Sequence, residues 1–232
     1  MNNIIFKGKN SNNFKCLIIS ELPPITKPKM RTETTTIDGL DGDIIEQLGY
    51  ASYDKTIKIG LKLGYMQYID EIIKYFSGEG QLILSNEPDK YYNATCNYQI
   101  DYERLVKFRT AKVKFHIQPY KYLVNEVPII FNITEETEVD VTNVGLEVSK
   151  PIMTLYGSGE VQILVNNLNV FTINIDDEYV TIDSEKEEAY HNDVLKNRQM
   201  LGDFPILKAG INTISWVGNI TKIEIHPKSR WL

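Results

Sequence analysis

The chain has 232 residues, a net charge of −6 and a pI near 5.2, and 42% of its residues are hydrophobic. These values are typical of a globular protein with room for two modest domains. They weigh against a nucleic-acid-binding protein, because such proteins neutralise phosphates with clustered Lys and Arg. No apolar stretch approaches the ~18 residues of a membrane span, and the N-terminus lacks a secretion signal. We therefore expect no membrane association and synthesis in the cytoplasm.

The stretch TTTIDGLDGDIIEQLGY, residues 34–50, is crowded with aspartate and glycine. A calcium loop of the EF-hand type needs oxygen ligands at positions 1, 3 and 5 and Glu at position 12. Neither Asp38 nor Asp41 as position 1 satisfies that spacing. Asp-Gly twice between extended segments is instead a turn signal. We predict a long polar hairpin without a metal, and its tip comprises Asp38, Gly39, Leu40, Asp41, Gly42 and Asp43.

Strict alternation of apolar and polar residues follows the hairpin. In TIKIGLKL, residues 56–63, Ile57, Ile59, Leu61 and Leu63 share one face. In AKVKFHI, residues 111–117, the apolar residues Ala111, Val113, Phe115 and Ile117 do the same. This period of two predicts antiparallel strands with one buried face.

One segment has helical spacing instead. YMQYIDEIIKYFSGEG, residues 65–80, places Ile69, Ile72, Ile73 and Phe76 on one face, and Gly78 and Gly80 follow as stop signals. The first half of the chain is therefore predicted to be a sheet with a single covering helix.

Pro119 and Pro128 interrupt the strand pattern, and we place a domain boundary there, giving domains 1–127 and 128–232. Beyond it the chain reads as short strands. Asn166-Asn167 and Gly218-Asn219 are predicted to be two-residue hairpin turns, because Asn and Gly tolerate left-handed backbone angles. Short strands at this spacing predict a β-sandwich.

Catalytic and metal-binding motifs are weak or absent from the sequence. His116, His191 and His226 have no metal-ligand spacing and are interpreted as solvated. The acidic run at 182–193 is typical of a solvated loop. Cys16 and Cys96 favour a reducing compartment, with a single disulfide between them left open. We predict a protein that is not an enzyme and has no cofactor.

The role of the clustered tyrosines is open between two interpretations. Tyr91, Tyr92, Tyr98 and Tyr102 gather near the end of the first half and suit either a core or a protein interface. Trp216 alternates in phase with Ile214 and is expected to face the core. Together with Tyr179 it is also the basis of an alternative function, a carbohydrate-binding module that recognises cell-wall saccharides.

The most specific motifs lie near the C-terminus: IDSE at 182–185, GDFPILKAGINTISW at 202–216 and the closing IHPKSRWL. The first half adds LPPI, IDGLDGD, KIGLKL and IIKYFSGEGQLILSNEPDKYYNA. With these motifs the chain resembles the distal tail proteins (Dit) of siphophages and prophages from Gram-positive hosts. The resemblance covers nearly the whole chain, but its motifs specify fold rather than chemistry.

The resemblance implies a β-sandwich-like N-terminal domain with one α-helix and a protruding hairpin, and a galectin-like C-terminal β-sandwich. The N-terminal domains would close into a homo-hexameric ring. The hairpin tip at 38–43 would be a belt that lies along a neighbouring subunit. The ring would join the major tail tube protein to the tail-associated tip and receptor-binding proteins, in the virion, and DNA would pass through its lumen without specific binding. The galectin sugar-contact signature is absent, since Val217 and Gly218 follow Trp216.

Overall fold

The computed structural model describes residues 2–39, 41–62 and 66–232, and the chain divides into two compact units. The N-terminal unit comprises residues 1–124 with Leu232, and the C-terminal unit comprises 125–231. The division falls three residues before the boundary that the sequence predicts at 127/128. Each unit has its own hydrophobic core.

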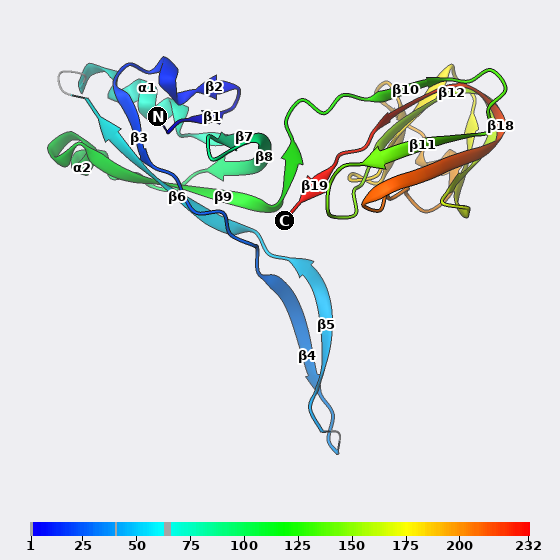
Figure 1. The fold of residues 1–232 in the computed structure, drawn as a ribbon, viewed down its shortest axis with the longest axis horizontal. Helices are drawn as coiled ribbons and strands as arrows, with labels where there is room; N and C mark the ends of the chain where they lie inside the picture. Colours follow the sequence, from blue (N-terminus) through cyan, green and yellow to red (C-terminus); the bar gives the residue numbers. More distant parts are fainter. Residues whose placement is uncertain (1, 40, 63–65) are drawn as a thin grey trace. The chain divides into compact units, whose positions relative to one another are not determined.

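One antiparallel sheet organises the N-terminal unit, with the strand order β2-β1-β7-β8-β9-β6-β3 (Figure 1). Its strands, with the hairpin strands β4 and β5, are β1 (Ile4–Phe6), β2 (Lys9–Asn10), β3 (Leu17–Glu21), β4 (Met30–Thr36), β5 (Asp43–Tyr50), β6 (Tyr53–Leu61), β7 (Gly78–Leu84), β8 (Glu87–Cys96) and β9 (Thr110–Leu123). Its helices are the 3-10 turns η1 (Ser11–Asn13) and η2 (Met66–Tyr68), and α1 (Ile69–Tyr75) and α2 (Tyr102–Phe108).

The core of this unit follows the predicted alternation. Ile57, Ile59 and Leu61 of β6 are buried. So are the four apolar residues predicted for β9: Ala111, Val113, Phe115 and Ile117. Leu63, predicted for the same face, lies outside the described residues. β6 and β9 are hydrogen-bonded neighbours, with Ile57 opposite Val113, so the two apolar rows form one surface.

The prediction of a single helix is wrong, because α2 is present as well. α1 matches the predicted segment: Ile72 and Phe76 are buried, and the helix ends before Gly78, whose φ of +87° only glycine adopts easily. α2 has seven residues, and Leu105 is the one fully buried side chain among those described in it, so its periodicity is too short to read from sequence. The Asp101 carboxylate caps it by accepting a 2.8 Å hydrogen bond from the Arg104 backbone N–H.

The C-terminal unit is built of strands. They are β10 (Ile129–Asn132), β11 (Glu138–Asn143), β12 (Ile152–Val165), β13 (Leu168–Ile175), β14 (Tyr179–Asp183), β15 (Glu188–His191), β16 (Val194–Leu195), β17 (Met200–Gly202), β18 (Gly210–His226) and β19 (Arg230–Trp231), with the 3-10 turn η3 (Asn197–Gln199). The predicted turn at Asn166-Asn167 joins β12 to β13, and both residues have positive φ, 52° and 64°. That prediction is confirmed.

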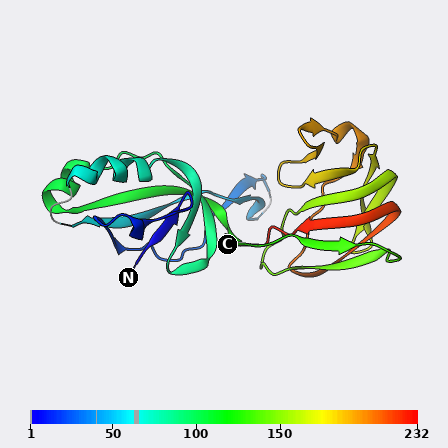
Figure 2. The ribbon, with the colours of Figure 1, turned by 90° about the horizontal axis from the view of Figure 1, so that it is seen from above.

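Two long bent strands make this unit two-layered (Figure 2). The first part of β12 pairs with β14 and the second part with β13, while β18 pairs with β11 and then with β10. The register between β12 and β18 shifts between Ser158 and Gln162, where both strands bend. Each strand therefore serves both layers of a sandwich around one core.

The predicted hairpin at Gly218-Asn219 is wrong, because β18 runs through this point as one strand. Gly218 has a φ of +120°, and a Cβ there would lie 2.5 Å from the Glu160 carbonyl oxygen. The dipeptide forms the bend between the layers, where β12 and β18 approach closely. The mainly β fold class is confirmed. No helix in the described ranges is long and apolar enough to cross a bilayer.

Candidate assembly interface

The hairpin predicted from the acidic stretch is present. β4 and β5 form a two-stranded sheet of their own, which leads away from β6 and β9 (Figure 1). At its tip Gly39 and Gly42 have φ near +85°, and the Thr36 hydroxyl donates a 2.9 Å hydrogen bond to the Asp43 carboxylate. The turn prediction is confirmed; Leu40 lies outside the described residues.

Both faces of this hairpin are open. Every described residue from Arg31 to Gly49 is exposed. Ile44 and Ile45 on β5 are 50% and 63% exposed, and Leu48 is 46% exposed. An isolated two-stranded hairpin is at best marginally stable in water. Exposed isoleucines on such a hairpin indicate a surface that another molecule covers.

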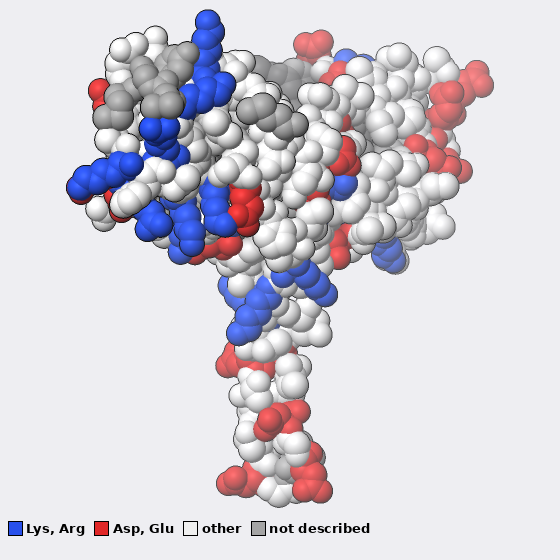
Figure 3. Space-filling view, turned by 60° about the vertical axis from the view of Figure 1, so that its left-hand side comes forward, with Lys and Arg blue, Asp and Glu red and all other residues white. Residues whose placement is uncertain are grey.

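The charged side chains of the hairpin are mainly negative (Figure 3). Residues 30–50 contain five carboxylates and one cationic side chain, Arg31. Glu33 on β4 lies directly opposite Glu46 on β5, and neither forms an ion pair with the described part of the chain. Like charges in this register destabilise a strand pair. The hairpin therefore carries a charge that a cationic partner would relieve.

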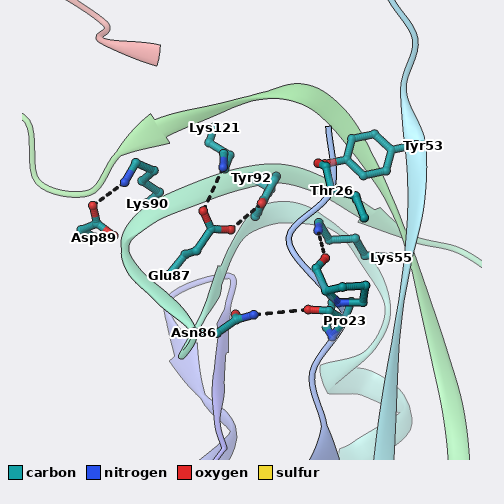
Figure 4. A network of polar contacts seen from close by, with 11 residues as sticks. Pro23, Thr26, Tyr53, Lys55, Asn86, Glu87, Asp89, Lys90, Tyr92 and Lys121 are labelled. Atoms are coloured by element: carbon teal, nitrogen blue, oxygen red, sulfur yellow. Dashed lines mark hydrogen bonds and ion pairs between the residues drawn. The ribbon is translucent and has the colours of Figure 1, made fainter. Parts of the chain in front are cut away.

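A buried polar network anchors the root of the hairpin (Figure 4). The ammonium of Lys55, a residue only 2% exposed, donates a 2.8 Å hydrogen bond to the carbonyl oxygen of Pro24. The Tyr53 hydroxyl donates to the carbonyl of Thr26 at 3.2 Å, and the Asn86 amide donates to that of Pro23 at 3.2 Å. Three side chains of the main sheet region thus hold the backbone that enters β4.

An ion pair completes the network. Lys121 and Glu87, 6% and 9% exposed, pair at 2.8 Å, and the Tyr92 hydroxyl donates to the other Glu87 oxygen at 2.8 Å. Burial lowers the pKa of Lys55, and Glu87 partly opposes this effect. Burial and the neighbouring carboxylate raise the pKa of Tyr92. The buried Glu87 carboxylate thus compensates the charge of two buried ammonium groups, those of Lys121 and Lys55.

Sequence reasoning missed this network, although the sequence carries a signal for it. Lys55 has the same parity as Ile57 and Ile59, so strand alternation places it on the buried face of β6. Lys121 is likewise in phase with the buried residues of β9. A lysine on the apolar phase of a strand needs a polar partner, and here the partners are Glu87 and the backbone of the hairpin root.

The candidate histidine and tyrosine residues of the N-terminal unit lie on its surface or in its core. His116 lies on the outward face of β9, 2.9 Å from the Asp54 carboxylate. The tyrosines divide between the two open readings: Tyr92 is 1% exposed in the core, whereas Tyr98 is 41% exposed and donates a 3.0 Å hydrogen bond to Asp54. The side chain of Tyr102 lies outside the described part.

The acidic run contributes a turn. Asp183 is buried, and its carboxylate accepts backbone N–H groups of Glu185 and Lys186. Cys16 and Cys96 are free and buried, and burial raises the pKa of the Cys96 thiol to about 11. Within the described residues, no three His, Cys, Asp or Glu side chains group as metal ligands.

Trp216 is 7% exposed and belongs to the C-terminal core. A side chain in that position cannot serve as a stacking platform for a sugar. Tyr179 contacts Tyr156 and His191, with ring centroids 5.3 and 4.4 Å away, and its hydroxyl donates to Asn192. The carbohydrate-binding alternative therefore loses the tryptophan on which it depends.

Comparison with known proteins finds a family match within the N-terminal unit. Residues 9–117 match the family described as phage tail protein RIFT-related domain. The matched segment contains the hairpin and every residue of the root network discussed above except Lys121. No curated protein sequence matches the chain.

The fold of the whole chain is similar to that of solved phage tail structures. It is similar to the Dit protein of phage SPP1, described as a paradigm of the hub adsorption apparatus in phages that infect Gram-positive bacteria, with a TM-score of 0.72, 15% identity and 100% of both chains covered. It is also similar to chains of the phage P2 baseplate in its activated conformation, with calcium (TM-score 0.55, 10% identity) and with strontium (TM-score 0.52, 11% identity), over 97% of each chain. The resemblance to siphophage distal tail proteins that the sequence predicts is confirmed.

Proposed function

We propose that this protein is a structural hub of a siphophage tail. Copies of the chain associate into a homo-hexameric ring through the N-terminal domain, 1–127, and the hairpin of each copy lies on its neighbour. The observation that carries the proposal is the exposed hairpin, which is held by hydrogen bonds at its root and is unpartnered along the described part of both faces. Contacts that run head to tail in this way close into rings when the rotation permits.

In the virion this ring would join the major tail tube protein to the tail-associated tip and receptor-binding proteins. DNA would pass through the lumen without specific binding, in keeping with the net charge of −6. The domain at 128–232 would be a galectin-like sandwich. The protein would act through its shape and its contacts, without catalysis and without a cofactor.

The experiment compares the intact chain with a variant that lacks the hairpin. The Ala51 backbone N–H donates a 2.8 Å hydrogen bond to the Lys29 carbonyl, so a two-residue Gly-Gly turn can replace residues 30–50 without parting the ends. Light scattering and negative-stain electron microscopy, with and without tail tube protein, report the assembly. Circular dichroism checks that the variant folds.

We expect rings from the intact chain and monomers from a folded deletion variant. Each ring contact should bury at least ~1,200 Å² in total, as stable interfaces do. An intact chain that stays monomeric in every condition overturns the hub proposal. Rings from the deletion variant would show that the hairpin is dispensable for assembly.

A further inference from the structure

A basic hollow of about 510 Å³ lies on the outer face of the N-terminal sheet, beside α2. Its lining includes Lys58 of β6, Lys112 of β9 and Arg104 of α2, with the polar side chains of Gln99 and Thr110. Figure 3 shows Lys and Arg side chains gathered on the N-terminal unit apart from the acidic hairpin. The lining is suited to carboxylates rather than to an apolar ligand.

The cations of this hollow are poorly neutralised. Lys58 and Lys112 face each other directly across β6 and β9. Lys58 is paired with Glu21, whereas Arg104 and Lys112 have no ion pair among the described residues. Asp101, the acidic residue of the lining, is engaged as the cap of α2. The like-charge pair mirrors the one between Glu33 and Glu46 on the hairpin, with the opposite sign.

The hairpin and the hollow of one chain cannot meet. The chain runs up β5 from the hairpin tip and continues along β6 away from it, and α2 lies toward the far end of β6 (Figure 1). Lys58 is five residues beyond Tyr53, about 17 Å along the strand at ~3.3 Å per residue. Hydrogen bonds from Tyr53, Lys55 and Asn86 hold the root in the orientation that directs the hairpin away from β6 (Figure 1). An acidic arm at one end and a basic hollow at the other define a head-to-tail contact between copies.

We propose that the hollow lined by Lys58, Arg104 and Lys112 receives the acidic hairpin of a second copy of this chain. The inference rests on the proposed hub function and names the acceptor of the hairpin. Arg104 and Lys112 pair with carboxylates of the incoming hairpin, Glu33 and Glu46 above all, so each like-charge pair gains counter-ions. Phe108 at the end of α2, 71% exposed, offers an apolar contact for Ile44 or Ile45.

The test is charge reversal with rescue. Arg104→Glu with Lys112→Glu removes the cations, and Glu33→Lys with Glu46→Lys removes the carboxylates; the third variant combines all four changes. Lys9→Glu with Lys15→Glu is the matched control, because both lysines are exposed and lie outside the hollow. Sedimentation velocity measures association of each full-length protein at low and high salt, and circular dichroism confirms folding.

Each two-site reversal should weaken association at least about tenfold, and the four-site variant should regain most of it. The control should associate like the unchanged chain, and the unchanged chain should associate less at 1 M salt than at 0.1 M. Rings that survive both reversals would overturn the acceptor assignment and leave the hub proposal standing. An unchanged chain that never assembles overturns the hub proposal, and the acceptor assignment with it.

Discussion

The ammonium of Lys55 lies 2.8 Å from the carbonyl oxygen of Pro24, and this contact joins the interior of the main sheet to the root of the hairpin. Lys55 is 2% exposed and lies over the rings of Tyr53 and Tyr92, 5.5 and 5.2 Å from their centroids. A buried charge is costly unless it is paired. The buried Lys55 ammonium has a structural role here, because it binds the backbone that enters β4.

Replacing Lys55 with Met should loosen the hairpin root without unfolding the protein. The methionine fills a similar volume and removes a buried charge, which offsets the lost contacts in overall stability. The freed Pro24 carbonyl should let the segment open more often. Exchange of the Ala51 amide, which donates a 2.8 Å hydrogen bond to the Lys29 carbonyl at the root, should then speed up about tenfold, since a charged hydrogen bond contributes ~1.5 kcal/mol or more. Hydrogen-exchange mass spectrometry measures this effect. Lys9→Met changes an exposed lysine outside both the root and the hollow, and it should leave this amide unchanged.

Replacing Glu87 with Gln should be strongly destabilising. The change leaves the ammonium groups of Lys121 and Lys55 buried without a carboxylate, and removing one member of a buried ion pair typically costs about 3 kcal/mol or more. Urea unfolding measures the loss. Glu103→Gln is the control, because its pair with Lys107 is exposed and such pairs contribute under ~1 kcal/mol. Equal losses in the two variants would contradict a special role for the buried pair.

The features that sequence predicts correctly depend on neighbours along the chain. The alternation of Ile57 and Ile59 identifies a buried strand face, and Asp-Gly repeats identify the tip of the hairpin. The two errors depend on contacts between distant segments. Gly218-Asn219 satisfies the local rule for a turn, but pairing with β12 makes it a bend in one strand. α2 is stabilised by the burial of Leu105 in a core assembled from distant strands.

The candidate interface likewise has parts that the sequence predicts and parts that it does not. The exposed hairpin can be predicted, since its polarity is local. The hollow cannot be predicted from the sequence, because Lys58, Arg104 and Lys112 come from three elements and meet only in the folded domain. The hairpin root is intermediate: the phase of Lys55 marks it as buried, but nothing near it in sequence identifies Glu87 as the compensating carboxylate.

The bend in β18 gives a prediction about glycine. Gly218 and Gly159 both have positive φ, +120° and +77°, but a Cβ at Gly218 would meet the Glu160 carbonyl oxygen at 2.5 Å, whereas one at Gly159 meets no atom within 4 Å. Gly159→Ala should cost about 1 kcal/mol of unfolding free energy from backbone strain alone. Gly218→Ala should cost roughly 2 kcal/mol more, because backbone must shift at the bend. Thermal or urea unfolding separates the two, and similar losses would count against a close approach there.

Asp54 gives a prediction about acid stability. Hydrogen bonds from Lys114 and His116, followed by a smaller contribution from Tyr98, lower the pKa of the Asp54 carboxyl to about 2, from an ordinary 3.8. A lowered pKa means that the carboxylate stabilises the fold above about pH 4 and loses that contribution as the pH falls toward 2. The urea midpoint of the unchanged protein should therefore fall over this range more steeply than that of Asp54→Asn, which should already be less stable at pH 7. Asp193→Asn changes a carboxylate with no hydrogen bond or ion pair to the described residues and should follow the unchanged protein. Parallel pH profiles for the unchanged protein and Asp54→Asn would show that Asp54 does not contribute in this way.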